Sequence, residues 1–449
     1  MGALKGQEET LQVAMVCLDE LVPEDCRYRR LDRLVDWSFV REAAGRYYVD
    51  EVGRPSIDPV VLVKLLVVAA LEGIGSTREL CRTAGLRLDL RRFLGYGFHE
   101  RLPAHQTLSH AQTRRFVDGA LFERLFLRSL ELCKQHGLVE GTHLSVDGFH
   151  AEANAALASL RASLALVAVA EPGVEEPGEG KPSRPFAPPQ FTLAEPRSGP
   201  TPKRRSSNQT SISRTDPEAK LRGKPGQRPH LVYRGQVAVD PKARCVVACL
   251  GEKADGYEGD ALAPILDRAR FASPQLESVG ADSGFAAERV WRGLDKRGIT
   301  AYVPPQPTML PTDGEPRGEA QRAALAARRR CKSERGVWAH KQRMGDAEGV
   351  IGELKNRHGL DRVRSRGTPR FHVQLLLGCT ALNYKRLAEH VPQAANGVAS
   401  APQAAASDLR PAATGACPAD QRAQDLFGHP LGRQLSAPPN TSTYTICLN

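Results

Sequence analysis

In the first 137 residues, apolar positions recur three and four apart in short runs separated by turn signals. This is the spacing of helices. The most apolar run, residues 60–71, follows Asp58 and Pro59, an N-cap and a residue suited to a first helical turn. Ser76, Thr77, Arg78 and Glu79 have the spacing of a capping box and predict the start of a second helix. Further helices are expected around residues 31–39, 88–94, 107–116 and 121–136, the last ending at Gly137.

From residue 143 the pattern changes to strands mixed with helices. Alternating residues 230–240 and the run 245–250 flank Pro241-Lys242 and predict a hairpin. Other strands are expected at residues 143–147, 278–281 and 299–303, and helices at 260–270, 286–297, 338–357 and 371–387. This order predicts an α/β fold in which helices cover a mixed sheet. The strands that carry Asp147 and Asp282 are neighbours if the hairpin lies outside the first of them.

Two stretches lack this periodicity. Residues 158–229 contain a segment rich in Pro, Ser, Arg and Gly, which predicts a flexible insertion. Residues 392–449 are rich in Ala, Pro and Gln and predict a disordered tail. We therefore expect a helical domain at 1–137, a sheet-containing domain at 138–391 that the insertion interrupts, and the tail.

The net charge of +11 favours a polyanionic partner. It is concentrated in residues 322–370, where we count 14 Lys and Arg against 5 Asp and Glu, a net charge of +9. This segment is either a DNA-contacting surface or a solvated basic helix. The ten cysteines form no CxxC pair and no cluster with histidine, so neither a zinc site nor a disulfide framework is indicated. No run reaches membrane-spanning length, and we expect a cytoplasmic protein.

The first domain also carries basic positions on its short helices. They fit a helical DNA-binding domain, and they fit equally well a packing or dimerisation domain with solvated arginines. The residues in question are Arg78, Arg82, Arg87, Arg91, Arg92, Arg114 and Arg115.

Three carboxylates come from separate predicted elements. Asp147 and Asp282 each stand at the predicted end of a strand, and Glu348 stands in a predicted helix. Such a set could hold two Mg²⁺ ions, which prefer oxygen ligands. Asp147-Gly148 is also a common turn signal, so the spacing alone leaves a structural interpretation open.

The ordered motifs resemble the DDE transposases of bacterial insertion sequences. The resemblance spans about residues 31–387 and rests on the set taken together. Its marks are Gly53-Arg54-Pro55-Ser56-Ile57-Asp58-Pro59, Gly73-Ile74-Gly75-Ser76-Thr77-Arg78-Glu79-Leu80, Val146-Asp147-Gly148-Phe149-His150-Ala151-Glu152-Ala153-Asn154-Ala155, Ser213-Arg214-Thr215-Asp216-Pro217-Glu218-Ala219, Ala281-Asp282-Ser283-Gly284-Phe285 and residues 343–355.

The resemblance implies an RNase H-like mixed sheet flanked by helices, preceded by an all-α domain. It implies that Asp147, Asp282 and Glu348 bind Mg²⁺, which Mn²⁺ can replace. Glu348 is preferred to Glu353 because Lys355 follows it by seven positions, as in the family. Lys355, Arg343 and Arg357 are the implied phosphate-binding residues.

The implied partner is double-stranded DNA, both the terminal inverted repeats of the element and its target, bound by a homodimer in the nucleoid. The chain departs from relatives at His340, where many carry Tyr, at Ser283, where Lys is common, and at Ala104, where Asp is usual. Two alternatives to an active transposase stay open. One is a DNA-binding remnant without catalysis, and the other is a host RNase H-like nuclease.

Overall fold

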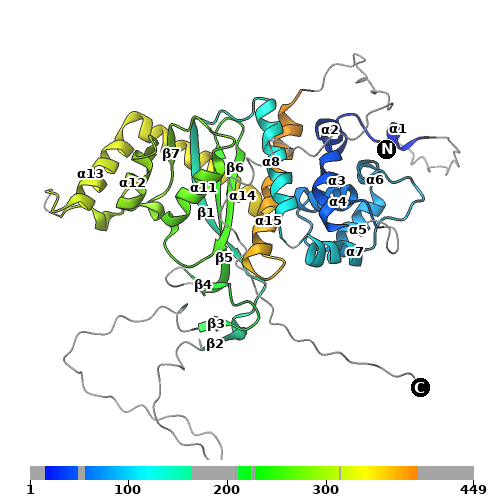
Figure 1. The fold of residues 1–449 in the computed structure, drawn as a ribbon, viewed down its shortest axis with the longest axis horizontal. Coiled ribbons are helices and arrows are strands. Elements are labelled where there is room, and N and C mark those ends of the chain that lie inside the picture. The colour runs from blue at the N-terminus through cyan, green and yellow to red at the C-terminus, as the bar shows by residue number, and fades with distance from the viewer. Residues whose placement is uncertain are drawn as a thin grey trace, which may run out of the picture. The chain divides into compact units, whose positions relative to one another are not determined.

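The computed structural model describes residues 16–48, 56–116, 118–162, 208, 211–223, 226, 228–312 and 315–392. The described residues all belong to one compact unit, and Figure 1 traces the chain through it. The predicted fold class is confirmed, because a helical N-terminal region is followed by a mixed sheet flanked by helices. The division of this unit into two domains near residue 137 stays a prediction.

The N-terminal helices begin where the capping signals predict. Asp58 Oδ1 accepts a hydrogen bond from Val60 N at 2.9 Å at the start of α4 (Pro59–Leu71). Ser76 Oγ accepts one from Glu79 N at 3.4 Å at the start of α5 (Thr77–Leu86). The other elements of this region are α1 (Leu18–Leu21), α2 (Arg27–Leu34), α3 (Ser38–Ala44), η1 (Gly45–Tyr47), α6 (Leu88–Leu94), α7 (His105–His110), the π-helical turn η2 (Ala111–Arg115) and α8 (Ala120–Gln135).

One predicted helix is two. The apolar spacing of residues 31–39 continues across a break, since α2 ends at Leu34 and α3 begins at Ser38. Asp36 lies in the break, and its Oδ1 accepts a hydrogen bond from Ser38 N at 2.9 Å. A side chain that bonds the backbone two residues on favours a turn over a continuous helix. Periodicity alone did not reveal this interruption.

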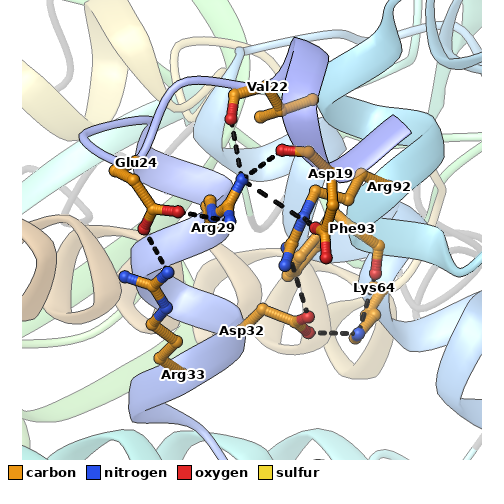
Figure 2. A network of polar contacts seen from close by, with 9 residues as sticks. All are labelled: Asp19, Val22, Glu24, Arg29, Asp32, Arg33, Lys64, Arg92 and Phe93. Carbon is orange, nitrogen blue, oxygen red and sulfur yellow. Dashed lines mark hydrogen bonds and ion pairs between the residues drawn. The ribbon is translucent and has the colours of Figure 1, made fainter. Parts of the chain in front are cut away.

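The apolar helix α4 buries one charge, that of Lys64. Lys64 Nζ donates to Asp32 Oδ1 at 2.6 Å and to Phe93 O at 2.7 Å. Figure 2 shows this pair inside a network that links α2 to α6 through Arg29 and Arg92. The ammonium also lies 4.6 Å from the ring centroid of Phe93. The charge is therefore buried with its partners, as a lysine in a helix interior requires.

Replacing Asp32 by Asn is expected to lower the free energy of unfolding by about 2 kcal/mol. The substitution leaves the Lys64 charge buried without its carboxylate, and the loss is smaller than for a fully buried pair because Asp32 is partly exposed. Urea unfolding at pH 7 measures it. The control is Asp19→Asn, whose exposed carboxylate is expected to contribute much less to stability than Asp32 does. Equal losses in the two variants would contradict the assignment.

The sheet is mixed and has the order β4-β5-β1-β7-β8, with β6 also paired to β5. The predicted hairpin is present, and it lies on the opposite side of β1 from β7. The parallel pairing of β1 with β7 confirms that the two aspartate-bearing strands are neighbours. The strands are β1 (His143–Glu152), β4 (Lys220–Arg222), β5 (His230–Asp240), β6 (Cys245–Lys253), β7 (Ser278–Gly280) and β8 (Thr300–Tyr302).

Helices cover the sheet. The elements between strands are η4 (Glu258–Ala261), α11 (Leu262–Ala269), η5 (Ser283–Phe285) and α12 (Glu288–Asp295), and η6 (Pro307–Met309) and α13 (Glu319–Lys332) follow β8. The helix α14 (Glu334–Arg357) contacts β1, β5 and β7. It begins four residues before the predicted start, because Ser333 Oγ accepts a hydrogen bond from Gly336 N at 3.2 Å and caps it there.

The last helix, α15 (Thr368–His390), joins the helical region to the sheet. It contacts α2, α4 and α8 on one side and β6 on the other. Buried Asn383 bonds the backbone of this edge strand twice, accepting from Val246 N at 2.9 Å and donating to Val246 O at 3.0 Å. His372 Nδ1 accepts from Gly251 N at 3.1 Å. These side chains satisfy backbone groups that an edge strand otherwise presents to other chains.

Part of the predicted insertion is described. Within residues 158–229 the structure shows η3 (Leu157–Ser159), a two-stranded sheet of β2 (Leu160–Ala162) and β3 (Ser211–Ser213), and β4. The predicted low-complexity segment at 171–207 and the predicted tail beyond residue 392 lie outside the described residues. In the described part of the chain, no helix is long and apolar enough to cross a membrane.

Candidate active site

Asp147 lies within β1 and not at its end, so its predicted place is corrected. The strand continues from His143 to Glu152, and Gly148 pairs with Gln236 of β5 in place of forming a turn. Asp147 is 9% exposed. Its Oδ1 accepts a hydrogen bond from Gly148 N at 2.8 Å, and its Oδ2 accepts one from Arg343 Nη1 at 2.7 Å.

Asp282 reaches the same region through the register of the sheet. Gly280, the last residue of β7, pairs in parallel with Ser145 of β1. Asp147 and Asp282 each follow these paired residues by two positions, so they lie at the same level of the sheet. Asp282 caps η5, and its Oδ1 accepts a hydrogen bond from Gly284 N at 2.9 Å. The structure therefore places Asp147 in β1 and Asp282 two residues beyond the end of the neighbouring strand β7.

Glu348 approaches from α14, together with Arg343 one and a half turns earlier. Arg343 Nη2 lies 3.0 Å from Glu348 Oε1, while Nη1 bonds Asp147. The guanidinium is buried and bridges the two carboxylates. Glu348 itself is half exposed. Arg343, predicted as a phosphate ligand, is thus in contact with two of the predicted metal ligands in this structure.

The pKa of Asp147 lies above its ordinary value. Burial is the largest cause and raises the pKa to about 6, although Arg343 acts in the opposite direction. The negative charges of Asp282 and Glu348 also raise it. The three carboxylates therefore interact electrostatically, which supports their assignment to one site.

Glu353, the alternative to Glu348, faces α15. It pairs with Lys385, with Arg386 at 2.6 Å and with His358 at 3.8 Å. Burial acts to raise its pKa, but hydrogen bonds from His358 and Lys385 hold the pKa below its usual range. Glu353 therefore joins α14 to α15, and Glu348 is the glutamate that pairs with the same arginine, Arg343, as Asp147.

The predicted phosphate ligands lie further along α14. Lys355 Nζ donates to His150 O at 3.1 Å, three residues beyond Asp147 in β1. Arg357 is exposed, and with Lys355 it lines a surface pocket that residues 71–73 close on the other side. Both cations thus lie on a surface that a DNA backbone could reach.

Several arginines of the helical region are engaged within the protein. Arg87 pairs with Asp89 at 2.6 Å, and Arg92 pairs with Asp19. Arg91 donates to the carbonyl oxygens of Gly85, Gly97 and Glu100. These contacts stabilise α6 and favour the packing interpretation for these three residues. Arg78 and Arg114 are exposed.

Sequence reasoning missed a fourth acidic residue at the site, Glu258 in η4. Burial raises its pKa, and the negative charge of Asp282 raises it further. The available signal was an acid-rich segment, Glu258-Gly259-Asp260, between the hairpin and α11. Nothing in its spacing distinguished Glu258 from the exposed acid Asp260.

The donor chemistry suits a hard divalent cation, because Asp147, Asp282 and Glu348 offer only carboxylate oxygens. Among the described residues, however, no three His, Cys, Asp or Glu side chains stand close enough together to hold a metal ion. Arg343 explains the separation of two of them, since its guanidinium lies between Asp147 and Glu348. A cation there requires that Arg343 move.

Two transposase family models match the sequence. A transposase domain (DUF772) matches residues 16–114, and a transposase DDE domain matches residues 200–384. The second match includes Asp282 and Glu348, while Asp147 lies between the two matches. The chain thus carries the parts of a DDE transposase in their expected order. By this domain content, it belongs to the DDE-type insertion-sequence transposases.

The solved structures that match are also transposases. One is the piggyBac transposase in a synaptic complex with hairpin DNA, with 8% identity over 81% of this chain and 74% of that chain, and a TM-score of 0.36. Another is the Mos1 transposase in a paired-end complex with a left transposon end, with 11% identity over 77% and 86%, and a TM-score of 0.18. Neither likeness is close enough to support an argument about the site. No curated protein matches the sequence.

Proposed function

We propose that this transposase binds the terminal inverted repeats of its element as a homodimer, cleaves the DNA there with Mg²⁺ and joins the 3′-ends to target DNA. The observation that carries the proposal is that the buried guanidinium of Arg343 on α14 pairs with both Asp147 and Glu348. The parallel pairing of β1 with β7 supports placing Asp282 in the same region, because Asp282 follows β7 by two residues. The DDE family match supports the same reaction class.

Asp147, Asp282 and Glu348 are the residues that would hold the cations, with Mn²⁺ able to replace Mg²⁺. When bound there, a pair of such ions would supply activation of the attacking water or 3′-hydroxyl and charge compensation at the leaving oxygen. Without them, Arg343 compensates the charge of Asp147 and Glu348. When released, its guanidinium is free to take a DNA phosphate, and Lys355 and Arg357 extend this contact along α14.

A cleavage assay on DNA that carries the element's ends tests the proposal. The wild-type protein is expected to cut at the repeat ends in Mg²⁺ or Mn²⁺ and to join 3′-ends to a target plasmid. End-specific binding without cleavage in either metal would instead indicate an inactive remnant. Cleavage with no preference for the repeats would indicate a host nuclease. Inverted repeats in the DNA flanking the gene supply the substrate.

We expect DNA binding to be strongly salt-dependent. The basic segment 322–370 carries exposed cations on α13 and α14, among them Arg328, Arg329, Lys332 and Lys341. Neutralising a phosphate contributes about −0.9 to the slope of log affinity against log salt. Five or more contacts therefore predict a slope of about −4 or steeper, measured by fluorescence anisotropy in EDTA.

Lys341→Gln is expected to make this slope shallower by about 0.9, the contribution of one phosphate contact. The matched control is Lys296→Gln, an exposed lysine that follows α12 and lies outside the basic segment, for which no change is expected. A wild-type slope shallower than about −1 would show that the basic segment is only a solvated surface.

A further inference from the structure

Glu258 lies between the two pieces of backbone that carry the aspartates. Its Oε1 is 2.5 Å from the position that a Cβ atom would take on Gly148, the residue after Asp147. Its Oε2 is 2.8 Å from the corresponding position on Gly284, two residues after Asp282. The absence of side chains at the two glycines therefore makes the room that this carboxylate fills.

The same carboxylate lies beside Asp282. A Cβ atom on Gly284 would lie 3.0 Å from Asp282 Oδ1 and 2.8 Å from Glu258 Oε2. Two acidic side chains thus share one small space next to the proposed metal ligands. Arg343 does not serve this part of the site, because its guanidinium contacts Asp147 and Glu348.

A second and independent observation points to a ligand at this place. Gln236 is fully buried in β5 opposite Gly148, and among the residues that the structure describes its Oε1 has no hydrogen-bond partner. The Nε2 of the amide donates to Glu252 Oε1 at 3.4 Å, which orients the oxygen the other way. A Cβ atom on Gly148 would lie 2.9 Å from this Gln236 oxygen and 2.5 Å from Glu258 Oε1.

A buried acceptor without a donor costs about 1–3 kcal/mol, so native proteins rarely keep one without a reason. Here it lies among the oxygens of Glu258, beside Asp147 and Asp282. A hydrated divalent cation would supply both the positive charge that the acids need and a water hydrogen for the amide oxygen.

We propose that Glu258 is a fourth acidic ligand of the divalent cations, on the Asp282 side of the site, and that Gln236 Oε1 accepts a hydrogen bond from a cation-bound water. This assignment rests on the proposed function. The assignment divides the acidic residues into two groups. Glu348 lies with Arg343 on α14, whereas Glu258 lies between Gly148 and Gly284, beside Asp282.

Metal binding by the full-length protein without DNA tests this. Isothermal titration with Mn²⁺, together with electron paramagnetic resonance of free Mn²⁺, gives the number of ions and their affinities. Glu258→Gln is expected to weaken one Mn²⁺ equivalent by about tenfold or more, the order found when a metal site loses a supporting oxygen. The control Asp260→Asn changes an exposed acid of the same 3₁₀ turn, which pairs with Arg289, and is expected to leave both affinities unchanged.

Asp147→Asn separates the inference from the function on which it rests. If this variant loses Mn²⁺ while Glu258→Gln binds it as the wild type does, Glu258 is not a ligand and the proposed function stands. If the wild type binds no Mn²⁺, both proposals fail. Should Glu258→Gln fold poorly by circular dichroism, Glu258→Asp carries the test, because it keeps the charge and shortens its reach. Wild-type affinity in that variant would overturn the assignment.

Discussion

Asp147→Asn is expected to abolish DNA cleavage and strand joining, by about 10³-fold or more, while end binding stays within about threefold of the wild type. The change keeps the size of the side chain and removes the charge that the cations need, and loss of a central catalytic group has effects of this order. Asn can still receive the hydrogen bond from Arg343, so the arrangement of β1 and α14 is retained. Gel-shift binding in EDTA and end cleavage in Mg²⁺, on the same preparations, measure the two effects.

Lys355→Ala provides the comparison. Lys355 bonds His150 O and no carboxylate of the site. Its removal takes away a phosphate contact, so the affinity for DNA and the cleavage rate are expected to fall together. If Asp147→Asn cleaves at the wild-type rate, Asp147 does not bind a catalytic metal. Its burial beside Arg343 would then be a structural ion pair.

The same substitution is expected to stabilise the metal-free protein. Burial raises the pKa of Asp147 from 3.8 to about 6, so the folded state holds this proton more tightly than the unfolded state does. The contribution of Asp147 to the free energy of unfolding is therefore most favourable below about pH 4, becomes less favourable as the pH rises from about 4 to about 6, and stays lower above that. Asn resembles the protonated acid, so the variant is expected to be more stable by about 3 kcal/mol at pH 7.5.

Urea unfolding of both proteins in EDTA, at several pH values from 4 to 7.5, measures this gain. The gain is expected to shrink to a small fraction of this value near pH 4, where Asp147 is protonated in the folded state and partly protonated in the unfolded state. Asp295→Asn is the control. It changes an exposed acid that pairs with Arg330, and is expected to alter stability by less than about 1 kcal/mol. A gain for Asp147→Asn that is the same at pH 4 and pH 7.5 would rule out titration of this side chain as its cause.

Much of this fold follows from local signals in the sequence. Asp58 with Pro59 and Ser76 with Glu79 mark helix starts that the structure reproduces, and the alternation of residues 230–240 matches β5 from end to end. These signals depend on neighbours in the chain, so one sequence suffices to read them. The predicted order of strands also places the strand of Asp147 next to the strand that leads to Asp282.

What local patterns could not provide are contacts across the fold. Asp147-Gly148 has the local form of a turn, yet it lies inside a strand because pairing with β5 on one side continues to Glu152. Arg343 meets Asp147 across 196 positions of sequence. Glu258 enters the site only because Gly148 of β1 and Gly284 of η5 leave space for it. Such features depend on the packing of elements that the sequence pattern cannot place relative to one another.

The position of α15 at the end of the described chain also bears on how the protein is made. A ribosome completes α2, α4 and α8 long before it adds residues 368–390, which cover them in the finished fold. Until then the apolar surface of α4 lacks one of its partners. During synthesis such surface is a site for aggregation or chaperone binding. The nascent transposase therefore acquires its complete core only after α15 has been synthesised, and a chain cut short before α15 lacks the helix that contacts both the N-terminal helices and the sheet.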